Sequence, residues 1–181
     1  MFKILDQYND WHAISIGEER RFQNFPTHEK HINLGQISHN KVLGYLSKSE
    51  IAVIPSRWEE PFGRTALEAS SRGCATIISN TGGLPETTDY AIKLKKLDTK
   101  NIENEIIKLI RNNKLRKRIQ IKSKNFVKHK LKINSQKIDL MRKSPSEIQD
   151  SFFSDAILIE NPLFIFLFFS NLIFLINSII F

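Results

Sequence analysis

The sequence predicts an α/β fold, with a Rossmann-like parallel sheet flanked by helices. Short apolar segments that suit buried strands alternate with longer segments of helical periodicity across residues 11–112, which is the pattern of βαβ units. Two turn-rich loops, 57–63 and 80–86, each follow a candidate strand. Because ligands bind beyond the carboxyl ends of the strands in such sheets, both loops are expected at a ligand-binding edge.

Four short apolar segments are the candidate strands. One ends on a glycine, and another is β-branched and short enough to be buried on both faces of a sheet. The segments are residues 11–17, 31–35, 51–56 and 75–79.

Three segments between and after these strands predict helices. Ser38 is placed to cap a helix whose apolar positions run to Leu46 on one face. Residues 63–72 carry small and apolar side chains and are followed by Gly73, a helix-stop residue. Residues 101–112 carry one apolar stripe with charges elsewhere, as a surface helix does.

The composition is that of one soluble globular domain. The chain has 181 residues, of which 41% are hydrophobic and 25% charged. Its one cysteine, Cys74, excludes an intramolecular disulfide and is expected to be a small core residue. The first residues lack the features of a secretory signal, so a cytoplasmic location is expected.

The loop and helix at residues 59–69 form a candidate phosphate-binding site. Pro61 fixes the approach to the helix, and Gly63 permits close approach of a ligand. The first N–H groups of the helix have no internal partner and favour an anion. Glu68 is costly to bury without a hydrogen bond, which a ribose diol would supply. Glu60 precedes the helix, where it could meet a group beyond the phosphates.

These residues resemble a known family. The sequence Glu-Pro-Phe-Gly-Arg-Thr-Ala-Leu-Glu-Ala at 60–69 and the sequence Ser-Asn-Thr-Gly-Gly-Leu-Pro-Glu at 79–86 are similar to motifs of family 4 glycosyltransferases of the GT-B fold. Residues 31–39 and 52–56 extend the resemblance, which fades near residue 142. It identifies residues 1–143 as a partial donor-binding domain, the carboxyl-terminal half of a GT-B fold.

The resemblance implies transfer of a sugar from a nucleoside-diphosphate sugar with retention at the anomeric carbon, without a cofactor or metal. Glu68 would hold the ribose hydroxyls, and Glu60 would contact the sugar as the catalytic residue. The other donor-binding residues would be Phe62, Gly63, Arg64 and Thr65 at the diphosphate, Gln36 and Ile37 near the base, and Gly82 and Gly83 in the second loop.

Two features of the family have no counterpart in the sequence. Family members carry an amino-terminal domain that binds the acceptor. They also carry an Arg and a Lys, placed after the first strand of the donor domain, that neutralise the leaving diphosphate. The chain is therefore expected to bind donor with little or no turnover alone. The alternative is a non-catalytic, membrane-anchored nucleotide-sugar-binding subunit beside a separate acceptor chain.

Simpler interpretations of several residues stay open. Glu60 and Glu68 could be ordinary exposed carboxylates, and Gly82–Gly83 could be a tight turn. Arg64 could pair with phosphate or only flank the helix. The His28–His31 segment lacks the spacing and third ligand of a zinc site, so surface histidines are favoured there.

Residues 91–143 are strongly basic. They hold 18 of the 27 Lys and Arg residues but four acidic ones. Phe126 is the one aromatic residue in the stretch, which disfavours nucleic-acid binding because stacking partners are lacking. Solvated helix faces and attraction to an anionic membrane surface remain.

The last part of the chain has a different character. Residues 144–161 are expected to be a linker, and residues 162–181 are 20 uncharged residues. As a helix these would span about 30 Å, enough to cross a bilayer with the folded part on the cytoplasmic face. The alternative is that residues from 144 onward are non-native sequence produced by a frameshift.

Overall fold

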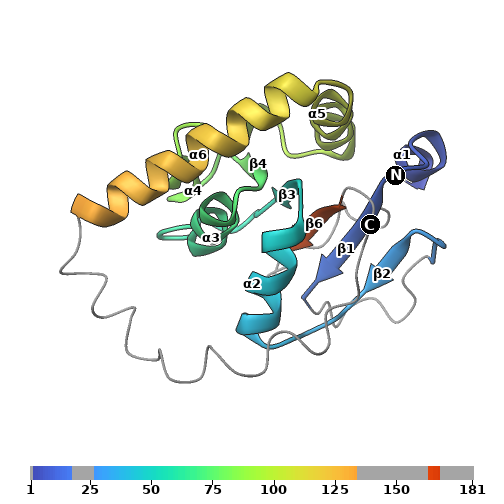
Figure 1. Ribbon diagram of the computed structural model, residues 1–181, viewed down its shortest axis with the longest axis horizontal. Helices are drawn as coiled ribbons and strands as arrows, with labels where there is room; N and C mark the ends of the chain where they lie inside the picture. The colour runs from blue at the N-terminus through green and yellow to red at the C-terminus, as the bar shows by residue number, and fades with distance from the viewer. Residues whose placement is uncertain (1, 18–26, 134–162, 168–181) are drawn as a thin grey trace.

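The computed structural model describes residues 2–17, 27–133 and 163–167 (Figure 1), and strands alternate with helices from residue 31 to residue 111. The strands are β1 (His12–Ile16), β2 (His31–Asn33), β3 (Ile51–Ile54), β4 (Ala75–Ser79), β5 (Ile92–Leu94) and β6 (Leu163–Leu167). The helices are α1 (Phe2–Gln7), α2 (His39–Lys48), α3 (Arg64–Arg72), α4 (Leu84–Thr87), α5 (Thr99–Arg111) and α6 (Asn113–Ile133).

The strands form one parallel sheet, which confirms the predicted fold class. Its order is β2-β1-β6-β3-β4-β5 (Figure 1), and each neighbouring pair runs parallel. A doubly wound nucleotide-binding sheet has the order 3-2-1-4-5-6. The order here follows the same pattern, but β6, the last strand in sequence, lies at the position that the first strand holds in that pattern.

The centre of the sheet is buried on both faces. All four residues of β3 have no exposed surface, and all five residues of β4 are buried. Continuous burial, rather than alternation, is typical of parallel strands covered on both sides. Burying each Ile side chain here contributes about 1.5–3 kcal/mol. The predicted strands at 51–56 and 75–79 are thus confirmed, with the first ending at Ile54.

The helix ends follow the predicted capping residues closely. Ser38 is the N-cap of α2, although its side chain makes no capping hydrogen bond. Gly73 ends α3 in the left-handed region at φ 92°, where glycine carries no steric cost. The Asp98 carboxylate accepts the N–H of Asn101 at 2.8 Å, so α5 begins at Thr99, two residues before the predicted start.

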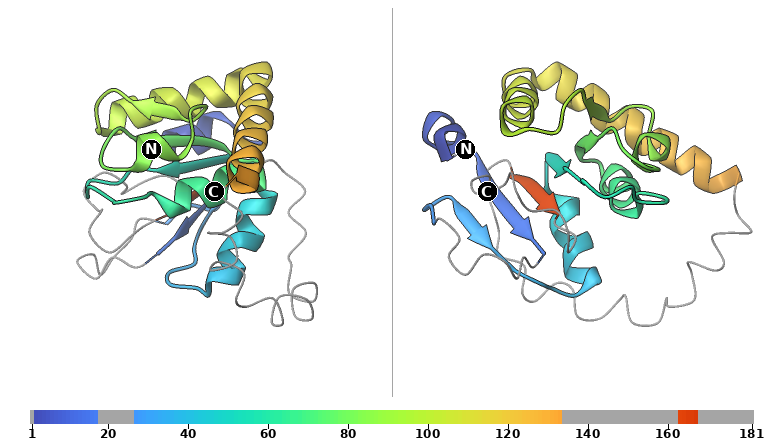
Figure 2. Two further views of the ribbon diagram at one scale, coloured as in Figure 1. Left: turned by 90° about the vertical axis from the view of Figure 1, so that its left-hand side faces the viewer. Right: turned by 180° about the vertical axis from the view of Figure 1, so that it is seen from behind.

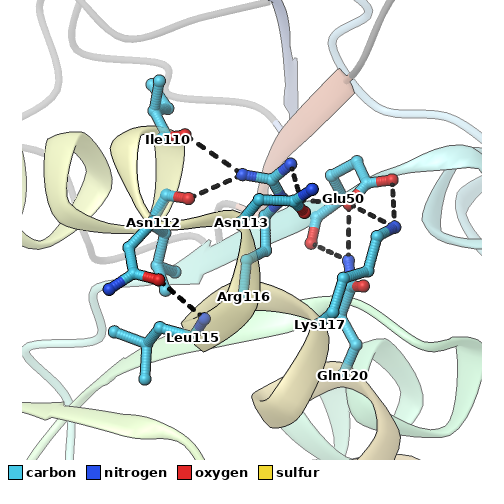
Figure 3. A network of polar contacts seen from close by, with 9 residues as sticks. Glu50, Ile110, Asn112, Asn113, Leu115, Arg116, Lys117 and Gln120 are labelled. Atoms are coloured by element: carbon cyan, nitrogen blue, oxygen red, sulfur yellow. Dashed lines mark hydrogen bonds and ion pairs between the residues drawn. The ribbon is translucent and has the colours of Figure 1, made fainter.

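The basic helix α6 is anchored to the sheet through Glu50, which directly precedes β3 (Figure 3). The Glu50 carboxylate accepts hydrogen bonds from Arg116 Nε at 3.1 Å, Lys117 Nζ at 2.9 Å and Gln120 Nε2 at 2.8 Å. Arg116 is buried and also donates to the Leu109 carbonyl at 2.7 Å. Part of the basic stretch therefore has a structural role that the charge count alone does not reveal.

Cys74 is a buried core residue, as expected. Its thiol donates to the Leu46 carbonyl at 3.1 Å. Burial, and secondarily the negative charge of Glu50, raises the pKa of the Cys74 thiol far above its ordinary value. The thiol is therefore protonated and unreactive at neutral pH.

The expectation of an apolar carboxyl-terminal helix is wrong for residues 163–167, which form β6. The segment Leu-Phe-Ile-Phe-Leu is aromatic, branched and apolar, a composition that suits a strand. Its backbone pairs with β1 on one side and β3 on the other, so each of these strands finds a hydrogen-bonding neighbour.

The expected linker at 144–161 and residues 168–181 lie outside the described residues. Within the described part of the chain, none of the helices has the length and apolarity needed to cross a bilayer.

Candidate functional site

The two predicted loops meet beyond the carboxyl ends of β3 and β4. The N–H of Gly83 donates to the carbonyl of Glu60 at 2.6 Å, so the expectation that both loops open on one edge is confirmed. Along the chain, β1 and β2 extend the sheet on one side and β3, β4 and β5 extend it on the other, so the order of the strands reverses between β6 and β3. In open α/β sheets this reversal point is where ligands bind, and the loop after β3 lies beside it.

Close packing of the loops explains the glycines of the second loop. A Cβ on Gly82, whose φ is +53°, would lie 2.6 Å from the Glu60 carbonyl oxygen. A Cβ on Gly83 would lie 2.3 Å from the Pro61 carbonyl oxygen. Both distances are shorter than any real Cβ contact, so these positions require glycine for contact with the first loop.

The amino terminus of α3 faces the same edge. Gly63 is its N-cap, in the left-handed region at φ 65° and without a side-chain capping bond. The first N–H groups of the helix, from Arg64 and Thr65, have no partner within the helix and lie at the positive end of its dipole. A Cβ on Gly63 would come within 2.7 Å of Leu84 Cδ2. Packing against α4, as well as backbone conformation, therefore requires glycine there.

Among the residues that the structure describes, two polar groups at this edge are buried without a hydrogen-bond partner. They are Oε1 of Glu60 and Oγ of Ser79, the last residue of β4. An unpaired buried carboxylate oxygen is costly, and such groups in native proteins call for an explanation such as a bound ligand. Ser79 belongs to the motif at 79–86. Its hydroxyl lacks a partner only because the fold buries it, so this feature could not be predicted from the sequence.

Glu68 is held by two basic side chains. Its Oε1 accepts from Arg64 Nε at 2.7 Å and lies 3.0 Å from His39 Nε2. The Glu68 side chain is 20% exposed, whereas that of Arg64 is 64% exposed. Arg64 thus pairs with Glu68 on the surface of α3, a contact that neither of its two interpretations included. His39, the first residue of α2, is a site residue that the sequence analysis missed.

Gln36 and Ile37 lie in the connection from β2 to α2. Gln36 is exposed, and Ile37 packs partly against the core. They precede His39 by three and two residues, so the contact between His39 and Glu68 brings their loop toward α3. Figures 1 and 2 show α2 and α3 side by side.

Two large aromatic side chains are exposed on the loop after β3. Trp58 is 63% exposed and Phe62 is 50% exposed. Phe62 was a predicted site residue, whereas Trp58 was not. Together they give an exposed apolar surface to the loop that also carries Glu60.

The histidines near residue 30 make hydrogen bonds within the fold. His28 Nε2 lies 3.1 Å from Asp6 Oδ1, and His31 Nε2 lies 2.9 Å from Ser15 Oγ. Among the residues that the structure describes, no group of three or more His, Cys, Asp or Glu is placed to hold a metal ion.

The parallel doubly wound sheet and the acidic site at its carboxyl edge define a Rossmann-like α/β domain. Residues 1–126 match the family of group 1 glycosyl transferases. The chain therefore belongs to the group 1 glycosyltransferase family.

Curated relatives share parts of this domain. Glycogen synthase of Mycobacterium tuberculosis is 43% identical over 53 residues, which cover 29% of this chain and 13% of the relative. An uncharacterized glycosyltransferase of Methanocaldococcus jannaschii is 30% identical over 115 residues, which cover 60% of this chain and 32% of the relative. The matched region thus spans a third or less of each of these relatives.

The fold is also similar to that of a solved GT-B enzyme. Sucrose-phosphate synthase from Thermosynechococcus elongatus superimposes with a TM-score of 0.54 at 17% identity, covering 80% of this chain and 50% of that protein. At this identity the similarity concerns the fold alone.

Proposed function

We propose that this chain supplies the donor-binding site of a glycosyltransferase and binds a nucleoside-diphosphate sugar. The observation that carries the proposal is the buried, unpaired Oε1 of Glu60 at the carboxyl edge of β3. A sugar hydroxyl is a neutral donor of the size and chemistry that would satisfy this oxygen. The amino terminus of α3, immediately beyond Glu60, suits the diphosphate of the same ligand.

Glu68 would bind the ribose of the nucleotide. Within the described part of the chain, both hydrogen bonds of the Glu68 side chain use Oε1, and a carboxylate has acceptor sites on both oxygens. A ribose diol would bond the second oxygen while Arg64 and His39 hold the first. Gln36 and Ile37 would then lie near the base.

The reaction proposed for the complete enzyme is transfer of the sugar to an acceptor with retention at the anomeric carbon. Glu60 would contact the sugar, and the N–H groups at the start of α3 would stabilise charge on the leaving diphosphate. The acceptor-binding domain would be a separate structural unit. We propose that the 181-residue chain alone binds donor without appreciable turnover.

The proposal is tested by ligand-observed NMR with the full chain and a panel of nucleoside-diphosphate sugars. Saturable binding of at least one donor is expected, weakened in Glu60→Gln. Glu105→Gln is the matched control, because Glu105 belongs to α5 rather than to the loops after β3 and β4, and it pairs with Lys108 at 2.6 Å. Absence of binding by folded protein would contradict the proposal.

An anionic membrane surface is a further proposed partner, supported by exposed cations on α6. Lys114, Arg118, Lys122 and Lys128 are exposed, and each cation near an anionic surface contributes about 1 kcal/mol. Salt-sensitive co-sedimentation with phosphatidylserine vesicles, and none with phosphatidylcholine vesicles, is expected. Equal behaviour with both vesicle types would contradict it.

A further inference from the structure

The strand β6 lies between two parts of the sheet that come from a different region of the sequence (Figures 1 and 2). On one side it pairs with β1 over five positions, from His12↔Leu163 to Ile16↔Leu167. On the other side it pairs with β3 over three positions, from Ile51↔Phe164 to Val53↔Phe166. β1 and β3 are not paired with each other in the sheet order.

The candidate site is divided in the same way. Gln36, Ile37 and His39 follow β2, which belongs to the β2-β1 pair. Glu60 and Glu68 follow β3, which belongs to the β3-β4-β5 group. Among the described strands, β6 makes the sheet continuous between the two groups.

A gap at this place would be costly. Without a strand between them, β1 and β3 would each present a row of unpaired backbone N–H and C=O groups at the centre of the sheet. Residues 134–162 precede β6 and number 29, a length that can extend to about 100 Å. The chain can therefore reach this position from the end of α6.

We propose that the gap between β1 and β3 is an acceptor site for one parallel apolar strand, and that residues 163–167 of the same chain occupy it. Occupation joins the two groups of strands and brings the loop after β2 to α3. The segment is thus a positioning element for the site. This last step rests on the proposed donor function, whereas the seating of the strand does not.

Hydrogen exchange tests whether the sheet depends on the strand. Ile165 is paired with both neighbours, Ile14 and Ala52, and proline there removes a backbone donor and disfavours a central strand. In Ile165→Pro we expect amide exchange in β1 and β3 to rise about tenfold or more. Ile165→Val, the matched control, keeps the backbone donor and should leave exchange unchanged. Unchanged exchange in Ile165→Pro would overturn the proposal.

A disulfide cross-link tests the seating directly, whatever the proline variant does to folding. Ala52→Cys and Ile165→Cys, in a Cys74→Ser background, place cysteines at paired positions of β3 and β6, which lie within disulfide range. The control pair is Ala52→Cys with Ile92→Cys on β5. Ile92 lies two strand spacings from β3, about 10 Å away, and is therefore too far from Ala52 for a disulfide.

We expect mild oxidation to give an intramolecular cross-link in the first pair and none in the control. No cross-link in the first pair, or cross-linked dimers instead of monomers, would overturn the assignment of this segment to the gap. Because the readout needs no nucleotide, it separates failure of this proposal from failure of donor binding.

Discussion

His39 Nε2 lies 3.0 Å from Oε1 of Glu68, although the two residues are 29 positions apart in sequence. The contact joins the first residue of α2 to the second turn of α3. Arg64, four residues before Glu68, donates to the same oxygen at 2.7 Å. Two side chains, one from each helix, thus fix the carboxylate that we propose binds ribose.

Arg64 is expected to matter for the ligand more than for folding. Exposed ion pairs four residues apart in a helix contribute about 0.3–0.5 kcal/mol, so Arg64→Ala should change the free energy of unfolding by no more than that. Donor affinity should fall several-fold, because Glu68 loses one of its two positioning contacts. Urea denaturation and a donor titration on the same variant separate the effects. A large loss of stability with unchanged affinity would contradict this role.

Gly82 and Gly35 form a matched pair that tests loop packing. Both have positive φ, +53° and +58°, but a Cβ on Gly35 would meet no atom within 4 Å. Gly35→Ala should cost about 1–2 kcal/mol of unfolding free energy from backbone strain alone. Gly82→Ala adds a clash with Glu60 and should cost about 2–5 kcal/mol. Equal costs in thermal or urea denaturation would show that the two loops do not pack as described.

Glu50 should make the stability of the protein sensitive to acid. Burial acts to raise the pKa of Glu50, but hydrogen bonds from Lys117, Gln120 and Arg116 outweigh it and hold the pKa below its ordinary value of 4.5. A lowered folded-state pKa stabilises the fold above pH 4.5, and this contribution is lost as pH falls through the folded-state value.

The variant Glu50→Gln removes the titrating group and keeps the side-chain shape. The free energy of unfolding of this variant should be lower than that of the unchanged protein. The difference should be largest near pH 7 and should shrink as the pH falls below 4.5. Urea denaturation across this range measures the difference. A deficit that does not change with pH would mean that the contacts of Glu50 with α6 are not ionic.

Glu60 and Glu68 should be separable by ligand chemistry. If Glu60 contacts the sugar, Glu60→Gln should weaken binding of the nucleoside-diphosphate sugar but leave the free nucleoside diphosphate unaffected. Glu68→Ala should weaken both ligands, because both carry the ribose. Competition titrations of the two ligands decide this, and equal losses for both ligands in Glu60→Gln would contradict its assignment to the sugar.

Local sequence signals predicted the strands and helices well because each depends on neighbouring residues. The continuous apolar run at 51–56 indicated a strand buried on both faces, and Gly73 marked the end of a helix. The short helix α4 and the strand β5 were missed, since four and three residues carry too little periodicity to be recognised.

Features that depend on distant contacts were not predictable from local pattern. The pairing of His39 with Glu68, and that of Glu50 with Arg116, join separate elements. The uncharged run at 162–181 indicated a helix by its length, whereas residues 163–167 pair as a strand between β1 and β3. That outcome depends on a gap in the sheet, which no local pattern encodes.

The central claim, that this chain binds a nucleoside-diphosphate sugar through Glu68, is tested most directly by donor titration. The full chain and its Glu68→Ala variant, both shown to be folded by circular dichroism, would be titrated by ligand-observed NMR with the donor that binds best in the panel. The account predicts saturable binding that Glu68→Ala weakens at least about tenfold, or about 1.4 kcal/mol. Equal affinity of the two proteins would contradict it.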